Sequence, residues 1–485
     1  MKNFNKSPIF ENIFKTLKED ALGRNDKIKY FLKLLKSIDD DAEKHDDISN
    51  SCSIALDSQW GGGKTFFVKQ IKLILDYYNM HSEMTEESKS RLKPIIETLE
   101  LECCHTCSTI YYDAWVNDNV NDPILSLVYT ATKSNQSTIP LWNKRSLPKI
   151  FGAIAESISG IKISNLQKEL SGVDLFESIK DDEYIKCEVN EFINTFMELH
   201  GATQLVIFID ELDRCRPTYA IQLLERIKHY FNDKRLVFIF SVNLQQLQHT
   251  VRSYYGADFD ATGYLNKFFD LRISLPEIDY DNHLPNILKF VHSSRGPLNR
   301  IDYFDEFSKV VVKYFRFSLR DIQRFYQLTR IAFSQKVFDL NIVKSDKPDM
   351  DAINNAVTFT CIFFIPIVLG LSIKDVNAYT RFITGNDSKP LCEILLACSA
   401  RDFPHIELLL NEDETFEKVS LEDLKDRLND IYSVLFPKDI NYYNFHKSVG
   451  KMSVSNAPKL PSSTKSELNQ IISLLAPFSD YEYEQ

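Results

Sequence analysis

One stretch near the N-terminus constrains the fold of this chain more than any other. Residues 54–65 read Ile-Ala-Leu-Asp-Ser-Gln-Trp-Gly-Gly-Gly-Lys-Thr, an apolar run followed by a glycine-rich turn and a Lys-Thr pair. Apolar side chains then recur at helical spacing through residues 67–78, which predicts an amphipathic helix packed on a sheet. Glycines let backbone N–H groups converge on an anion, and a helix N-terminus adds its positive dipole end. The stretch therefore predicts a phosphate-binding loop in an α/β protein.

In this interpretation the loop surrounds the phosphates of a nucleotide, Lys64 reaches the outer phosphates and the Thr65 hydroxyl is a ligand of Mg²⁺. Ser58 stands where the pattern G-x-x-x-x-G-K-[ST] has its first glycine, so the backbone there must avoid a strongly positive φ. The alternative is a flexible glycine-rich loop that ends at a helix. The expected nucleotide-binding residues are Ser58, Gln59, Trp60, Gly61, Gly62, Gly63, Lys64, Thr65 and Phe66.

A second segment carries the acidic groups that a magnesium–nucleotide site requires. Residues 205–209 are five consecutive apolar residues, typical of a strand buried on both faces of a parallel sheet, and Asp210 and Glu211 follow. We expect Asp210 to hold the metal and Glu211 to act as the general base for an attacking water, with Lys64 as the other catalytic residue. Taken alone, an acidic pair after a strand is an ordinary solvated turn, and the phosphate-binding loop is what favours the metal site.

Three further polar residues follow these strands. Asp213 and Arg214 form either an ion pair that shapes the loop or a direct phosphate sensor. Residues 236–240 predict another buried strand, and Asn243 follows it at the same edge of the sheet. Asn243 either orients the attacking water as a sensor or simply caps the next segment.

Four stretches together resemble one family. They are residues 19–24 (Glu-Asp-Ala-Leu-Gly-Arg), the loop at 58–65, residues 111–115 (Tyr-Tyr-Asp-Ala-Trp) and residues 210–215 (Asp-Glu-Leu-Asp-Arg-Cys). The likeness extends over about the first 330 residues and is to the KAP-family P-loop NTPases, a group within the signal-transducing (STAND) and AAA-like ATPases. The chain departs from the family pattern at Ser58 and at Glu211, where Asp is more usual in the family.

The resemblance implies an α/β fold: a P-loop NTPase with a mostly parallel central sheet flanked by helices, a helical lid and an all-α C-terminal region. We expect residues 1–276 to form the NTPase core with its N-terminal helices and a helical insertion at about 135–200. Residues 277–338 would form the lid, and 339–485 a helical C-terminal domain with a short acidic tail. Within the lid, Arg320 and Arg324 are candidate phosphate sensors; the alternative is the solvated face of an amphipathic helix.

Composition limits the other functions. The net charge of −11 argues against nonspecific nucleic-acid binding. Nine cysteines with no secretory signal point to a reducing cytoplasm, and the Cys-Cys-His-Thr-Cys run at 103–107 lacks the spacing of a zinc site. The uncharged residues 356–373 include Pro366 and Gly370, and we interpret them as a core helix or helix pair, with a membrane-associated segment as the alternative.

These observations lead to two main hypotheses, both with ATP and Mg²⁺ as cofactors. The first is an ATP-hydrolysing switch or remodelling ATPase, which the resemblance extends to bacterial defence against phage. The second is a nucleotide-gated scaffold that binds ATP with little hydrolysis; a small-molecule kinase ranks last because no acceptor motif is visible. We expect a protein partner to bind through the helical insertion or the C-terminal region, and homo-oligomers are compatible with the sequence. The trigger, the base preference and any arginine finger are left open.

Overall fold

The computed structural model describes residues 9–20, 22–44, 50–101, 106–120, 122–133, 175–280, 300–334 and 363–397, with a few residues between 425 and 433. The chain divides into two compact units, which meet in sequence between Asp279 and Tyr280 and are described separately. The predicted boundaries of core, lid and C-terminal domain stay predictions. Several segments of the sequence predictions fall outside the described residues. They are residues 103–105 of the Cys-Cys-His-Thr-Cys run, most of the insertion, and the linker and acidic tail of the C-terminal region.

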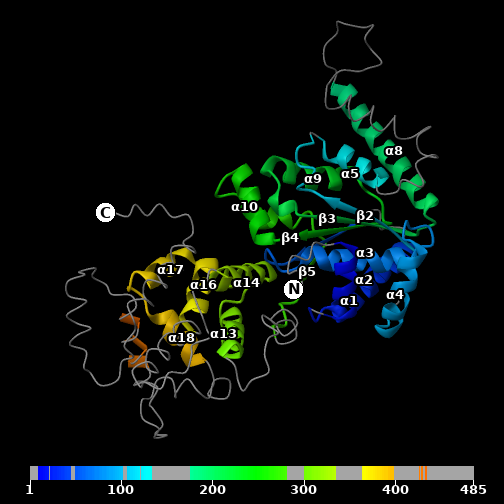
Figure 1. Ribbon diagram of the computed structural model, residues 1–485. Helices are drawn as coiled ribbons and strands as arrows, with labels where there is room; N and C mark the ends of the chain where they lie inside the picture. Colours follow the sequence, from blue (N-terminus) through cyan, green and yellow to red (C-terminus); the bar gives the residue numbers. More distant parts are fainter. Residues whose placement is uncertain are drawn as a thin grey trace, which may run out of the picture. The chain divides into compact units, whose positions relative to one another are not determined.

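The first unit is an α/β domain built on five strands (Figure 1). Its strands are β1 (Cys52–Asp57), β2 (Cys107–Asp113), β3 (Gln204–Asp210), β4 (Leu236–Val242) and β5 (Leu271–Ser274). Its helices are α1 (Phe10–Lys18), α2 (Asn25–Lys44), α3 (Lys64–Tyr78), α4 (Glu86–Thr98), α5 (Pro123–Lys133), α8 (Leu175–Leu199), α9 (Pro217–Tyr230), α10 (Leu244–Tyr255) and α11 (Ala261–Leu265), with a short 3₁₀ turn η3 (Leu212–Arg214).

The strand order is β2-β3-β4-β1-β5, and every pairing is parallel. β4 therefore lies between β1, which leads into the glycine-rich loop, and β3, which ends at the acidic pair. Because parallel strands end at one edge of a sheet, Asp57, Asp113 and Asp210 lie along the same edge. This edge carries the candidate site.

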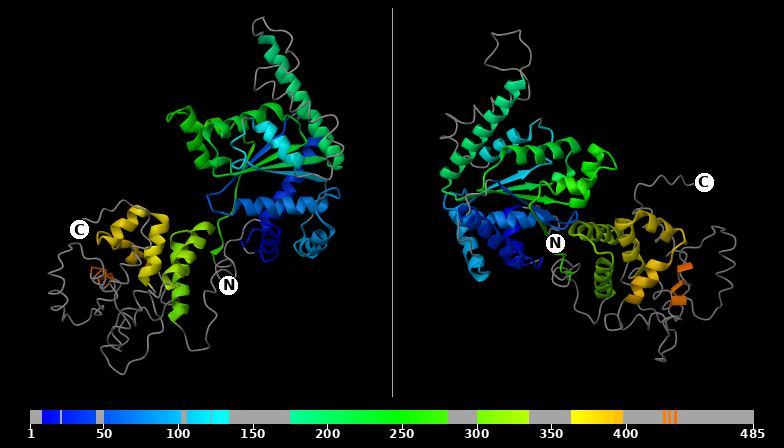
Figure 2. Two further views of the ribbon diagram at one scale, coloured as in Figure 1. Left: turned by 45° about the horizontal axis from the view of Figure 1, so that its top comes forward. Right: turned by 180° about the vertical axis from the view of Figure 1, so that it is seen from behind.

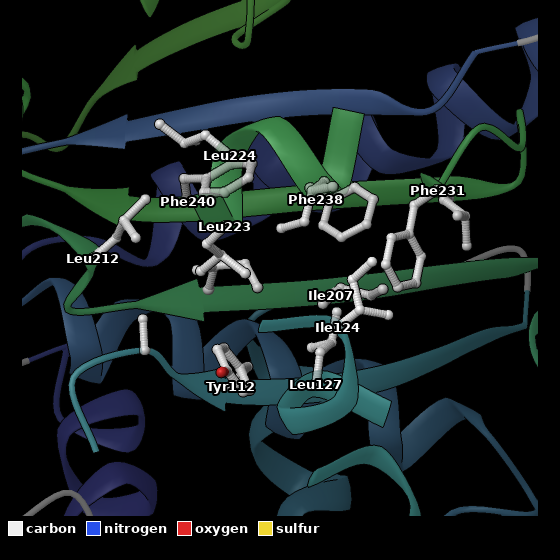
Figure 3. Close-up of a cluster of buried hydrophobic side chains, with 14 of the residues drawn as sticks. Tyr112, Ile124, Leu127, Ile207, Leu212, Leu223, Leu224, Phe231, Phe238 and Phe240 are labelled. Atoms are coloured by element: carbon white, nitrogen blue, oxygen red, sulfur yellow. The ribbon is translucent and has the colours of Figure 1, made fainter. Parts of the chain in front are cut away.

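Two helical layers cover the sheet because its central strands are apolar on both faces (Figure 2). Helices α1 to α4 cover one face, where Phe67 and Ile71 of α3 pack on Phe208 of β3. Helices α5, α8, α9 and α10 cover the other face, and Figure 3 shows Phe238 and Phe240 of β4 among the residues of that core. The predicted α/β fold with a parallel sheet is confirmed.

The second unit is helical in its described part, with α13 (Arg300–Tyr314), α14 (Leu319–Ser334), α16 (Ile365–Lys374), α17 (Val376–Ile383) and α18 (Lys389–Ala397). These helices share a hydrophobic core of their own. In the described part of the uncharged stretch, residues 363–372 are buried in that core, and Ile373 is partly buried against it. Within the described residues, no helix has both the length and the apolar character needed to cross a bilayer.

Candidate nucleotide site

The loop between β1 and α3 takes its shape from two glycines. Gly61 and Gly63 have φ angles of 76° and 82°, in the left-handed region that disfavours side chains. Ser58 is not among the described residues with a positive φ, and its N–H donates to the Val242 carbonyl of β4 at 3.2 Å. The serine that replaces the first glycine of the pattern therefore costs no backbone strain.

The remaining glycine of the loop, Gly62, lies in a crowded position. A Cβ at this position would overlap Ser58 Oγ and lie 3.0 Å from the Gln59 carbonyl oxygen. The Gly62 N–H also donates to that carbonyl at 3.1 Å, which closes a tight turn over residues 59–62. Ser58 and Gly62 are thus a matched pair, in which the serine hydroxyl occupies the volume that a side chain at position 62 would need.

The close contact between Ser58 and position 62 predicts that a change at Ser58 restores the ATP binding lost by a change at Gly62. Gly62→Ala should weaken ATP binding about 5- to 30-fold, because overpacking of this kind costs about 1–2 kcal/mol. Adding Ser58→Gly removes the overlapping hydroxyl and should restore most of that loss, and Ser58→Gly alone should bind within about 3-fold of wild type. Calorimetric titration of the three variants with ATP and Mg²⁺ measures the effect. Additive losses in the double variant would contradict the pairing.

Lys64 lies folded over the loop. Its Nζ donates to the Ser58 carbonyl at 2.5 Å and to the Gln59 carbonyl at 3.3 Å, and the side chain is buried. Burial lowers the pKa of the ammonium, and nearby carboxylates oppose this, Asp213 most strongly and Asp210 next. The ammonium thus stands among the acidic groups of the site.

The N-terminus of α3 is open to an anion. Gly63 occupies its N-cap position, and no side chain of the described residues caps the helix. Lys64, Thr65 and Phe66 form the first turn of the helix, where backbone N–H groups have no intrahelical partner. Uncapped donors beside a lysine suit the phosphates of a nucleotide.

Asp210 is 1% exposed and held in a fixed position. Its Oδ2 accepts from the Tyr111 hydroxyl at 2.8 Å, and its Oδ1 accepts from the Glu211 N–H at 3.0 Å. Burial and the Asp210 charge raise the pKa of Tyr111, which keeps that hydroxyl protonated as a donor. Tyr111 is a positioning residue that the sequence analysis did not single out, although it begins the Tyr-Tyr-Asp-Ala-Trp stretch.

The alternation of side chains along β3 sets the direction of Asp210. Ile209 packs in the core beneath α5 and α9, whereas Phe208 packs on the α3 face, so Asp210 also faces α3. Thr65 lies in the first turn of that helix. Asp210 and Thr65 are therefore on one side of the sheet, and their oxygen atoms are of the kind that Mg²⁺ prefers.

Glu211 has a left-handed backbone, with φ of 62°, a conformation uncommon for residues with a side chain and frequent at functional sites. Burial raises the pKa of its carboxyl, and the neighbouring Asp210 charge adds to this. Its Oε2 pairs with Arg214 Nε at 2.7 Å, which opposes the rise. Of the two alternatives for Asp213 and Arg214, the ion pair between them is wrong, because Arg214 pairs with Glu211 and lies over the Trp115 ring. A phosphate-sensing role stays a prediction.

Asp213 instead connects the glycine-rich loop to the end of β4. Its Oδ2 accepts from Trp60 Nε1 at 2.6 Å and from the Asn243 N–H at 3.1 Å. One carboxylate thus joins the glycine-rich loop, the acidic loop and the end of β4. Sequence reasoning noted both Trp60 and Asp213 but could not pair them, because 153 positions separate them in the chain.

The three candidate sensors differ in placement. Asn243 Oδ1 accepts from the N–H groups of Gln245 and Gln246 and caps α10, the second of the two alternatives for this residue. Arg320 and Arg324 lie on the exposed side of α14, in the second unit. A sensor role for any of them stays a prediction.

The parallel sheet, the glycine-rich loop at the start of α3 and the acidic pair at the end of β3 define a P-loop NTPase. A model of the KAP family P-loop domain matches residues 25–332, more than half of the chain, and the chain belongs to this family. No curated protein matches the chain. A solved structure of PCH-2 from C. elegans is 12% identical and covers 75% of this chain and 73% of its own, with a TM-score of 0.29. Family membership supports nucleotide binding.

Proposed function

We propose that this protein binds ATP with Mg²⁺ and hydrolyses it, and that the cycle switches the contacts of its helical regions with a protein partner. One observation carries the proposal: Lys64, the uncapped start of α3, Asp210 and Glu211 are gathered at one edge of the sheet. By resemblance, the setting is the bacterial cytoplasm in defence against phage. Homo-oligomers remain part of the proposal, and native mass with ATP and with ADP tests them.

The residues divide the work as follows. Lys64 exchanges the carbonyls of Ser58 and Gln59 for the outer phosphates, while the N–H groups of the first turn of α3 hold the remaining oxygens. Thr65 and Asp210 would hold Mg²⁺, which when bound neutralises phosphate charge. Glu211 takes a proton from a water whose oxygen attacks the γ-phosphorus as the bond to the β,γ-bridging oxygen breaks, releasing ADP and phosphate.

The raised pKa of Glu211 predicts the pH dependence. A general base must be deprotonated, so ATP turnover should fall on the acid side with an apparent pKa above that of an ordinary glutamate. Arg214 favours the charged carboxylate, so Arg214→Met should move this acid limb to still higher pH. Steady-state turnover between about pH 5 and 9 measures the acid limb of the wild-type protein and that of the Arg214→Met variant. An acid limb that Arg214→Met leaves in place would contradict the pairing.

The alternative function, a nucleotide-gated scaffold, is favoured by one feature: Arg214 restrains Glu211 on its own loop. Calorimetry with ATP and Mg²⁺, together with phosphate release in the presence and absence of cell extract, separates the functions. Binding with release supports the ATPase. Binding without release under either condition supports the scaffold, and absence of binding would remove both.

A further inference from the structure

A buried hydroxyl at the end of β4 has no part in the site as described so far. Ser241 is 0% exposed, and its Oγ has no hydrogen-bond partner among the described residues. Buried polar groups nearly always have a hydrogen-bond partner, because a group that loses its hydrogen bonds to water on burial and gains none in exchange destabilises the folded protein. Ser241 shares this property with a few other buried side chains, so its place in the sheet decides which bound group could be its partner.

The sheet register places Ser241 beside the candidate metal residue. Ser241 is paired with Leu56 of β1 on one side and with Asp210 of β3 on the other. In a parallel sheet, residues in register on neighbouring strands point to the same face. Ser241 therefore lies between the strand that leads into the glycine-rich loop and the strand that ends at the acidic pair.

The flanking residues of β4 confirm the direction of this side chain. Phe240 and Val242 pack in the core on the side of α9, so Ser241 faces the opposite side, where Leu56 packs against the residues of α3. The hydroxyl thus shares a face of the sheet with Asp210 and with the first turn of α3, which contains Thr65. The unpartnered hydroxyl is therefore adjacent to the candidate metal residue Asp210, on the same face of the sheet.

We propose that Ser241 is a positioning residue of the magnesium–nucleotide site, whose hydroxyl hydrogen-bonds to a water of the bound ion's hydration shell beside Asp210. In the structure the Asp210 oxygens accept from the Tyr111 hydroxyl and the Glu211 N–H, and the Ser241 hydroxyl does not donate to that carboxylate. Mg²⁺ retains several waters when proteins bind it, and groups that contact those ligands tune its affinity. The inference rests on the proposed nucleotide binding.

Ser241→Ala separates this role from packing. The substitution removes a hydroxyl that has no partner in the ligand-free protein, so thermal stability without nucleotide should be unchanged or higher. The affinity for ADP in the presence of Mg²⁺ should fall about 10-fold, while the affinity for ADP with EDTA stays at the wild-type value. Calorimetric titration with ADP, with Mg²⁺ or with EDTA, measures the difference without turnover.

The chain offers a matched control. Ser308 on α13 is also 0% exposed with an unpartnered Oγ, but it belongs to the second unit. Ser308→Ala should keep the wild-type gain in ADP affinity on adding Mg²⁺. A wild-type gain in Ser241→Ala, or a loss of stability in that variant without nucleotide, would overturn the role of Ser241. If the wild-type protein itself fails to bind ADP with Mg²⁺, the proposed function fails and this inference fails with it.

Discussion

Glu211→Gln is expected to lower ATP turnover by about 10²- to 10⁴-fold while ATP affinity stays within a few-fold of wild type. The glutamine amide has nearly the same size as the carboxyl but cannot accept the proton of the attacking water. Loss of the charge also removes the repulsion between Glu211 and Asp210, so binding of an anionic nucleotide should not weaken. Phosphate release gives the turnover, and calorimetry with ATP and Mg²⁺ gives the affinity.

Glu198→Gln is the matched control for this experiment. Glu198 is an exposed residue in the last turn of α8, which leads into the start of β3 and therefore lies toward the opposite edge of the sheet. Its removal takes away the same charge from the same domain and should leave turnover unchanged. Turnover in Glu211→Gln equal to wild type would take Glu211 out of the base role. An equal loss in the control would show a general effect of charge.

Lys64→Ala is expected to weaken ATP binding by about 30- to 150-fold. Hydrogen bonds from a charged donor contribute about 2–3 kcal/mol, and each 1.4 kcal/mol changes the affinity tenfold. In the ligand-free protein the ammonium donates to two loop carbonyls, so it is held beside the open N-terminus of α3 before phosphate arrives. Titration with ATP and Mg²⁺ gives the affinity, and thermal unfolding shows whether the variant remains folded.

Lys69→Ala tests whether any lysine of α3 would serve. Lys69 is one turn further along the helix, and its Nζ lies over the Tyr111 ring at 4.5 Å. Burial lowers its pKa, as for Lys64, and the Asp210 charge is the strongest influence that opposes this. Binding by Lys69→Ala should stay within a few-fold of wild type. Similar losses of ATP affinity in both variants would show that the net positive charge of the site, and not the position of Lys64, determines the affinity.

Most of the sheet could be predicted from the sequence, because β1, β3 and β4 are runs of apolar residues that a parallel sheet buries on both faces. β5 was missed. It has four residues, includes the exposed Arg272, and pairs with β1 on one side. Such a short, half-exposed edge strand carries no apolar run, and its pairing depends on where the preceding helices place it.

In the candidate site, too, some features could be predicted from the sequence and others could not. The Gly-Gly-Gly-Lys-Thr run and the acidic pair after an apolar strand are local patterns, so the sequence could nominate Lys64 and Asp210. The hydrogen bond of Trp60 to Asp213 and that of Tyr111 to Asp210 join segments far apart in the chain. No spacing rule reaches across such distances. The ion pair considered for Asp213 and Arg214 was wrong because the distant Trp60 and Asn243 donate to Asp213, while Arg214 pairs with Glu211 on its own loop.

The sequence by itself determined that this protein is a P-loop NTPase of the KAP family, because a phosphate-binding turn and a buried acidic strand end need particular residues at short spacing. The tertiary structure alone decided that β4 lies between the two strands that carry these motifs. That order places Ser241 beside Asp210 and lets Asp213 hold Trp60 and Asn243 together. Strand order follows from how the helices pack on both faces of the sheet, a cooperative property of the whole domain.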